Sequence, residues 1–366
     1  MSERPPKKVT ITEVARRAGV STATAGRVLG GYGYASHDIR EKVRAAAQAL
    51  GYRPNLLARS LITGRSQTIG IVAGDVESPF YASILRGIAD VARSKGFGVV
   101  VTNSDEIFQR EREAVQLLVE KQVDGLIVTP SDLTSGAYLK DVIASGCPVV
   151  QIDRVVRGLD ADSVTVDSVE AARTCVGQLI SAGHRRIGLI AELESSEIGD
   201  LRSFVDLASY SASPTVSLYP SWQRLLGYLQ AHREAGLAIE IELVRRVGAY
   251  SAAAAKEETI DLLAGGRAPT ALFTADGLMS AGAMDAISQL GIEIPRALSL
   301  ACFDDLDWMR FLPPGITAIE QPLNQMGRTA ARLVLARIQG VGGPAQHLVL
   351  PAQLVPRHSI AAPAGL

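Results

Sequence analysis

The chain has 366 residues, enough for two or three domains, and its three cysteines (Cys147, Cys175 and Cys302) lie far apart without a C-x-x-C pair. This cysteine pattern indicates neither a disulfide framework nor a zinc site and favours a reducing cytoplasm. The sequence has no apolar run of about 18 residues and no secretion signal, so we expect neither membrane insertion nor export. The net charge of −1 divides unequally: residues 1–65 hold twelve Lys and Arg against four acidic residues, a balance of +8, and the rest carries −9, which indicates phosphate binding at one end only.

Two short helices joined by a glycine turn are predicted near the N-terminus. Thr10 and Glu13 have the spacing of a capping box before an apolar helical pattern, and Gly19 ends this first helix. Ser21 is placed to cap a second helix. The buried side of that helix would consist of Ala25, Val28 and Leu29. The pattern is typical of a helix-turn-helix, whose second helix presents its N-terminal residues to the major groove of DNA.

A third helix completes the predicted headpiece, residues 1–50. Ser36 would cap it and Gly51 would end it. Its apolar face would consist of Ile39, Val43, Ala46, Ala47 and Leu50. Residues 51–66 are interpreted as a hinge, with a helical turn or two after Pro54 that orders on DNA.

This N-terminal sequence resembles the LacI family of repressors. The similar motifs are Val9 to Ala15, Gly19-Val20-Ser21, Thr24, Arg27-Val28-Leu29 and Gly51-Tyr52-Arg53-Pro54-Asn55, and the similarity continues along nearly the whole chain. Two positions depart from the family pattern, where Gly26 replaces the usual Ser and Gly30 the usual Asn, so no polar side-chain contact is expected there.

The resemblance implies a set of DNA-binding residues. Those that read bases would be Thr22, Ala23 and Arg27. Those that support phosphate contacts would be Ser21, Thr24, Tyr34 and Ser36. Further DNA contacts are implied at Thr12, Asn55 and Ala58, and Leu61 would be wedged into the minor groove, although it could also contact the body.

From Thr68 onward, short apolar runs alternate with amphipathic stretches, which is the pattern of βα units and parallel sheets. Candidate strands are residues 69–73, 98–102, 125–129, 149–152, 163–166, 187–191, 244–247, 271–274 and 298–303. So many strands favour two lobes with a cleft between them. The predicted fold is an all-α helix-turn-helix headpiece plus an α/β, two-lobed, periplasmic-binding-protein-like body of parallel doubly wound sheets. The lobes would comprise residues 67–164 with 323–349, and 165–322 with 350–360.

Polar residues at the predicted strand ends are candidates for binding a small molecule. They are Asp75, Asp153, Asp276 and Asp304. A carboxylate there can accept hydrogen bonds from sugar hydroxyls, but each is about equally compatible with a helix N-cap. The family resemblance supports Asp304, in Phe303-Asp304-Asp305, and adds two residues. These are Phe80, in Ser78-Pro79-Phe80-Tyr81, and Arg224, in Arg224-Leu225-Leu226-Gly227-Tyr228.

Two alternatives remain open within the body. About twenty more residues than the family pattern requires lie between His184 and Arg224, so either a loop is inserted near the cleft or Arg202 is the ligand-binding arginine. We prefer Arg224 because Gly227 and Tyr228 accompany it. Trp308 could stack on a sugar ring or belong to the rim or the core.

Rival functions fit the sequence less well. A glycosidase could use Asp304 and Asp305, but adjacent residues rarely aim both carboxyl groups at one bond. A solute carrier would have no use for residues 1–61. The sequence therefore predicts a regulator without enzymatic activity, cofactor or metal. As a homodimer it would bind palindromic double-stranded operator DNA, most simply as a repressor, under the control of a sugar or sugar-acid effector. No leucine heptads follow Pro351, so no tetramerising helix is expected.

Overall fold

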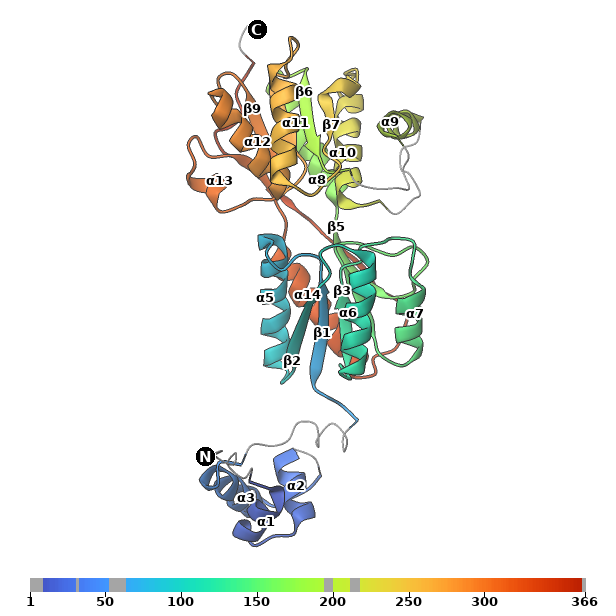
Figure 1. Ribbon diagram of the computed structural model, residues 1–366, viewed down its shortest axis with the longest axis vertical. Coiled ribbons are helices and arrows are strands. Elements are labelled where there is room, and N and C mark those ends of the chain that lie inside the picture. The colour runs from blue at the N-terminus through green and yellow to red at the C-terminus, as the bar shows by residue number, and fades with distance from the viewer. Residues whose placement is uncertain (1–8, 31–32, 53–63, 194–199, 211–217, 364–366) are drawn as a thin grey trace, which may run out of the picture. The chain divides into compact units, whose positions relative to one another are not determined.

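The computed structural model describes residues 9–30, 33–52, 64–193, 200–210 and 218–363. The chain divides near residue 68 into two compact units, an all-helical headpiece and an α/β body (Figure 1). The predicted fold class is confirmed.

Among its described residues the headpiece contains three helices, α1 (Ile11–Ala18), α2 (Thr22–Gly30) and α3 (His37–Ala49). The predicted capping box is present at α1, where the Glu13 amide donates to Thr10 Oγ1 at 3.4 Å and the Thr10 amide donates to Glu13 Oε2 at 2.7 Å. Gly19 then adopts a left-handed φ of 67°, which glycine tolerates without strain. Ser36 occupies the N-cap position of α3, but its side chain makes no capping hydrogen bond, so that part of the prediction is wrong. A small core joins the helices. It contains Val14, Ala15, Ala25, Val43, Ala46 and Ala47.

The described part of the body forms two six-stranded sheets, which define an N-lobe and a C-lobe (Figure 1). The N-lobe sheet has the order β11-β5-β4-β3-β1-β2. Its strands are β1 (Thr68–Ala73), β2 (Gly98–Asn103), β3 (Gly125–Val128), β4 (Val149–Ile152), β5 (Asp162–Val166) and β11 (His347–Leu350). Its helices are α5 (Pro79–Ser94), α6 (Phe108–Glu120), α7 (Ala137–Ala144) and α14 (Leu323–Ile338).

The C-lobe repeats this architecture with the order β12-β10-β9-β8-β6-β7. Its strands are β6 (Ile187–Ala191), β7 (Val244–Arg246), β8 (Ala271–Thr274), β9 (Ser299–Phe303), β10 (Thr317–Glu320) and β12 (Gln353–Val355). Its helices are α8 (Ser168–Ser181), α9 (Leu201–Tyr210), α10 (Pro220–Glu234), α11 (Ala252–Ala264), α12 (Gly277–Leu290) and α13 (Trp308–Phe311), with a 3-10 turn at Ile241–Leu243. Parallel pairs dominate, and β10 with β12 is antiparallel.

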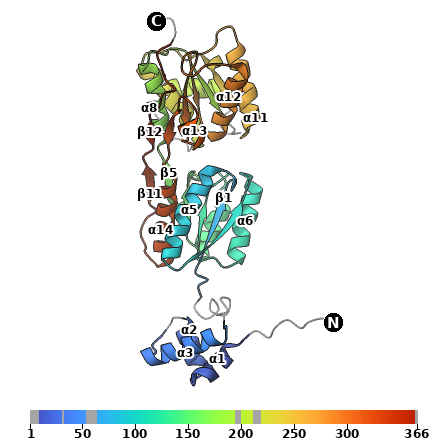
Figure 2. The same ribbon diagram turned by 90° about the vertical axis from the view of Figure 1, so that its left-hand side faces the viewer.

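The chain passes between the lobes after β5, between β10 and α14, and between β11 and β12 (Figure 2). All nine predicted strands are present within one or two residues, and the sequence analysis missed β10, β11 and β12. β5 ends at Val166, inside the N-lobe sheet, while the exact lobe boundaries stay predictions.

Close helix packing explains the glycine of the Arg224-Leu225-Leu226-Gly227-Tyr228 motif. A Cβ atom added at Gly227 on α10 would overlap the Val169 carbonyl oxygen of α8 and lie 2.8 Å from the Ala172 Cβ atom. The glycine therefore lets the two helices approach.

We expect Gly227→Ala to lower the free energy of unfolding by about 1–3 kcal/mol, because the added methyl group overpacks a close helix contact. Chemical denaturation measures this change. The matched control is Gly177→Ala in α8, where an added Cβ meets nothing within 4 Å. The higher helix propensity of alanine should leave this control neutral or more stable by up to about 1 kcal/mol. Equal stability of the two variants would contradict the packing argument.

Candidate functional sites

The start of helix α2 presents a polar surface in the headpiece. Ser21, Thr22, Ala23 and Arg27 are exposed, and Thr24 is half-buried. Ser21 caps the helix as predicted, since the Thr24 amide donates to Ser21 Oγ at 3.1 Å. Thr24 Oγ1 lies 2.9 Å from Ser21 Oγ and accepts from Arg27 Nη2 at 3.3 Å. This chain of contacts aligns the Arg27 guanidinium with the amino end of the helix, the end that carries partial positive charge and suits phosphate.

Other predicted DNA-binding residues are distributed over the same unit. Thr12, Tyr34 and Ser36 are exposed, and Tyr34 is 85% exposed, which is unusual for an aromatic side chain without a partner surface. Gly33 has a φ of 72°, and a Cβ atom there would lie 3.2 Å from Arg27 Cδ. Gly33 thus leaves room for the Arg27 side chain, a role the sequence analysis missed. Asn55, Ala58 and Leu61 lie outside the described residues.

A polar cavity of about 320 Å³, here called the inner cavity, lies between the two lobes of the body. Five of the six predicted ligand-binding residues line it. They are Phe80 and Asp153 from the N-lobe and Arg224, Asp276 and Asp304 from the C-lobe. The structure therefore brings together residues that are separated by more than two hundred positions in the chain.

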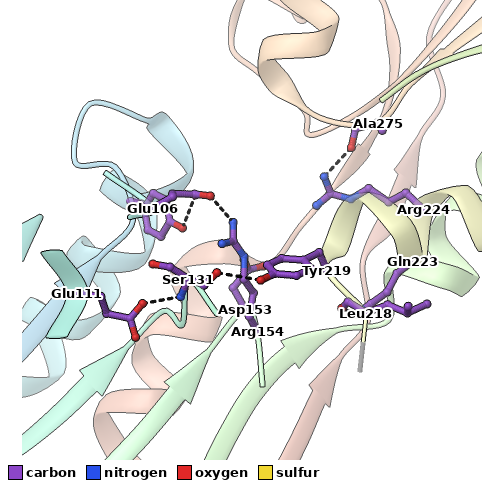
Figure 3. Close-up of polar contacts among 11 residues, drawn as sticks. Glu106, Glu111, Ser131, Asp153, Arg154, Leu218, Tyr219, Gln223, Arg224 and Ala275 are labelled. Atoms are coloured by element: carbon purple, nitrogen blue, oxygen red, sulfur yellow. Dashed lines mark hydrogen bonds and ion pairs between the residues drawn. The ribbon is translucent and has the colours of Figure 1, made fainter. Parts of the chain in front are cut away.

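Arg224 is held by two contacts at the C-lobe side of the inner cavity, of which Figure 3 shows the one to Ala275. Its Nη1 donates to the Ala275 carbonyl oxygen at 2.5 Å, and its guanidinium lies 3.9 Å from the centre of the Phe303 ring. Its buried Nε has no hydrogen-bond partner in the described structure. Because an unpaired buried donor is costly, this nitrogen is a candidate for a ligand oxygen.

The carboxylates of the C-lobe have structural partners as well as cavity positions. Asp276 caps α12 by accepting from the Met279 amide at 2.9 Å, which confirms the N-cap alternative for this residue. Asp304 accepts from the Gly277 amide at 3.2 Å and from Gln321 Nε2 at 2.6 Å. Asp304 and Asp153 directly follow buried strands, β9 and β4, with left-handed φ values of 70° and 69°. Such conformations in non-glycine residues cluster at functional sites.

Burial raises the pKa of Asp153 and of Asp276 to about 6 each. Arg224 lowers both pKa values, and the Asp304 carboxylate raises both. Unfolded carboxyl groups titrate near pH 4, so between about pH 4 and 6 the folded chain keeps protons that the unfolded chain has lost. The contribution of these two groups to the free energy of unfolding should therefore fall as pH rises through this window and level off above it.

We expect Asp276→Asn to reduce this fall in stability and to stabilise the protein at pH 7.5, by about 3 kcal/mol at most. Asparagine keeps the helix cap and removes the buried charge. Denaturant unfolding at several pH values measures the effect. The control is Asp167→Asn, since Asp167 is an exposed cap of α8 that accepts from the Glu170 amide. A wild-type pH profile in the Asp276→Asn variant would refute the role of burial.

Three other residues from the sequence analysis lie outside the inner cavity. Asp75 lines a larger neighbouring cavity of about 920 Å³, here called the outer cavity, which shares Phe80, Tyr250 and Asp304 with the inner one. Arg202 is exposed on α9 and does not line the inner cavity, a placement that favours Arg224 as the ligand-binding arginine. Trp308 packs against a hydrophobic cluster of the C-lobe, in agreement with its core alternative.

Several cavity residues were missed by the sequence analysis. Arg154 Nη2 lies 2.8 Å from Glu106 Oε2, and Tyr81 donates to Glu106 Oε1 at 3.2 Å (Figure 3). Tyr219 and Tyr250 line the cavity from the C-lobe. Two signals were available. Tyr81 stands in the Ser78-Pro79-Phe80-Tyr81 motif, from which only Phe80 was chosen, and Arg154 directly follows Asp153 at the end of a predicted strand. The other residues stand in no motif.

Two family profiles match this chain. The profile of bacterial regulatory proteins of the lacI family matches residues 10–55, and that of the periplasmic binding protein-like domain matches residues 176–360. The first covers the described headpiece helices, and the second covers most of the C-lobe together with α14.

Characterised relatives resemble the chain over nearly its whole length. The HTH-type transcriptional regulator GalS of Salmonella typhimurium is 33% identical over 96% of this chain and 97% of its own. The HTH-type transcriptional repressor CytR of Escherichia coli is 31% identical over 90% of both chains. The Lac repressor dimer bound to operator and the anti-inducer ONPF is 27% identical, with a TM-score of 0.80 over 97% of this chain and 100% of that one. A complex of the transcriptional regulator CelR with cellobiose is 26% identical, with a TM-score of 0.67 over 96% of this chain and 100% of that one.

Proposed function

Because the chain belongs to the lacI family of bacterial regulatory proteins, we propose that it represses transcription by binding a palindromic operator as a homodimer under the control of a sugar effector. Its relatives are DNA-binding transcriptional regulators, not enzymes. The observation that carries the proposal is the convergence of Arg224, Asp276 and Asp304 with Asp153 on one inner cavity. An effector bound there would favour one arrangement of the lobes over another and so change the affinity for DNA.

The charge of the inner cavity supports a neutral, hydroxyl-rich effector over a sugar acid or sugar phosphate. Five carboxylates and two guanidinium groups line it. They are Glu106, Asp153, Glu192, Asp276 and Asp304, with Arg154 and Arg224. Arg154 is already paired with Glu106 and lies 3.5 Å from Asp153. An anionic ligand would add repulsion, whereas sugar hydroxyls can donate to the carboxylates.

The surface of the N-lobe supports the proposal of a dimer. Strand β2 lies at the edge of its sheet, and Val100 and Val101 on it are 39% and 42% exposed. An edge strand with exposed valines is a ready surface for pairing with a second copy.

Under this proposal the protein acts in the bacterial cytoplasm, where operator DNA lies. In the described residues, no helix is both long and apolar enough to cross a membrane.

We expect sedimentation to give two chains per particle and selection from random duplexes to enrich a palindrome of two half-sites. One headpiece reads one half-site, so the twofold symmetry of the DNA mirrors that of the dimer. Footprinting should then protect both half-sites. A Val101→Asp variant on β2 should shift the protein toward monomers and weaken operator binding, while Val341→Asp, at an exposed valine in the loop after α14 and outside any strand, should not. A stable monomer that protects the whole palindrome would contradict the proposal.

A further inference from the structure

Tyr219 of the C-lobe contacts the loop after β3 of the N-lobe (Figure 3). It is the N-cap residue of α10 and is followed by Pro220 at the first helical position, which fixes the direction in which the chain enters the helix. It stands at the end of the stretch in which this chain has more residues than the family pattern requires. No motif of the family resemblance therefore predicts the position of its side chain.

The Tyr219 side chain reaches across the cleft. Its hydroxyl donates to the Ser131 carbonyl oxygen of the N-lobe at 2.9 Å, and its ring lies 5.7 Å from the Arg154 guanidinium (Figure 3). A tyrosine here combines a wide apolar ring with a polar end, so one side chain both fills the gap and makes a directional bond.

Both N-lobe partners of Tyr219 are held in place by carboxylates. Glu111, fully buried on α6, accepts from the Ser131 amide at 2.5 Å and from the Tyr138 hydroxyl. Burial raises the pKa of Glu111, and its hydrogen bonds to Ser131 and Tyr138 oppose that rise. Arg154 is held by Glu106 at 2.8 Å. The Ser131 carbonyl oxygen is thus a fixed acceptor and not part of a freely moving loop.

The opposite side of the cleft is open. The outer cavity of about 920 Å³ adjoins the inner cavity there and is lined by the start of α5, the start of α12 and α13. In Figure 1 these helices lie at the left of the body, whereas α10 and α7 lie at the right. Tyr219, Ser131 and Arg154 line only the inner cavity.

We infer that Tyr219 closes one side of the cleft, so that a ligand enters and leaves the inner cavity through the outer cavity on the other side. Tyr219 also becomes a specificity-determining residue: a ligand too large for the inner cavity must extend toward α5 and α13, where Phe80, Leu278 and Leu306 offer apolar contact. The inference takes from the proposed function only that the cleft binds a ligand, and closure can be measured without ligand or DNA.

The test uses two reporter cysteines in the full-length protein. Ser131 Oγ is buried behind the closed side and has no hydrogen-bond partner in the described structure, so Ser131→Cys places a thiol there. Ser83→Cys places a thiol on α5 at the outer cavity. The rate of reaction of each with a maleimide dye is measured, and the rate of the parent protein, with its half-buried Cys147, is subtracted.

We expect Ser131→Cys to react slowly and Ser83→Cys to react fast. Adding Tyr219→Phe should accelerate labelling of Ser131→Cys roughly two- to tenfold, because loss of one hydrogen bond of ordinary strength favours opening by that factor. Tyr219→Ala, which also removes the ring, should accelerate it further. Labelling of Ser83→Cys should stay unchanged.

The matched control is Tyr250→Phe, which removes a hydroxyl from the same cavity but leaves the bond to Ser131. It should leave the rate at Ser131→Cys as it is. Three results would overturn the inference. The first is an equal labelling rate at the two reporter cysteines in the protein that keeps Tyr219, and the second is no acceleration by Tyr219→Phe. The third is equal acceleration of labelling at both reporters, which would indicate a general loosening of the fold. Failure to bind DNA or any sugar would count only against the proposed function.

Discussion

Binding to operator DNA should weaken by about three to five orders of magnitude between roughly 50 and 200 mM salt, the range expected for six to ten phosphate contacts. The reason is the charge of residues 1–65, a balance of +8 in a chain whose net charge is −1. Lys and Arg side chains that neutralise phosphates release condensed counterions, and added salt reverses that release. Fluorescence anisotropy on a labelled duplex at several salt concentrations measures the slope. A DNA affinity that does not change with salt concentration would contradict the prediction that the headpiece binds DNA.

Substitution of Arg27 tests the sequence-specific component of DNA binding. If its guanidinium reads a base, Arg27→Ala should reduce discrimination between operator and random DNA by about 1–3 kcal/mol. The control is Arg44→Ala on α3, since Arg44 is exposed and lies 3.7 Å from Glu41. That variant should weaken binding to both DNAs alike, if at all. Equal losses on both DNAs for Arg27→Ala would make Arg27 a phosphate contact.

Under the proposed function, effector binding should weaken about tenfold or more in Arg224→Ala and roughly three- to tenfold in Asp304→Asn. The first change removes a charge-assisted hydrogen bond to the ligand, worth roughly 1.5–3 kcal/mol, and the second replaces such a bond with a neutral one of about half that strength. Asparagine is chosen at position 304 because it tolerates the left-handed φ of 70° there. Affinity for the operator without effector should persist, since losing ligand contacts leaves the DNA-binding arrangement in place.

The measurement pairs calorimetry with operator titration for each variant, using the sugar that stabilises the wild type most in a thermal-shift screen. The control is Arg173→Ala, because Arg173 lies on α8 outside the cavity, 2.5 Å from Glu170 and 2.9 Å from Glu234. It should leave effector affinity unchanged. Unaltered ligand affinity in both cavity variants would show that the site lies elsewhere, whereas a joint loss of ligand binding, operator binding and solubility would indicate a structural role.

The fold was predictable wherever a strand is buried on both faces. β1, β3, β4, β6, β8 and β9 consist mostly of apolar residues, and such runs stand out in a sequence. The strands that were missed have weaker patterns. β11 and β12 are only partly buried, and β10 begins with a threonine and ends with a glutamate around two apolar residues. Their pairing depends on neighbours far away in the chain, which single-sequence patterns do not contain.

The candidate sites were predictable to the extent that a residue stands in a motif or at a strand end. Arg224, Asp153, Asp276 and Asp304 met that condition and line the inner cavity, and Asp75 met it but lines the outer one. Tyr219 met neither condition. Its position depends on how α10 begins and on the loop after β3, two features about ninety residues apart whose proximity comes only from tertiary packing.

The interleaving of the chain between the lobes also constrains folding during synthesis. Helix α14 covers the N-lobe core, where Met326, Ala330 and Val334 are fully buried together with Ile88 of α5. The ribosome makes these residues some 250 positions after α5, which at about 5–20 residues per second takes roughly 12–50 seconds. Until then the apolar face of β1, β3 and β4 lacks its cover. The headpiece, whose core uses only residues before about 52, can fold early, whereas the N-lobe must wait for nearly the whole chain and exposes an aggregation-prone surface to chaperones meanwhile.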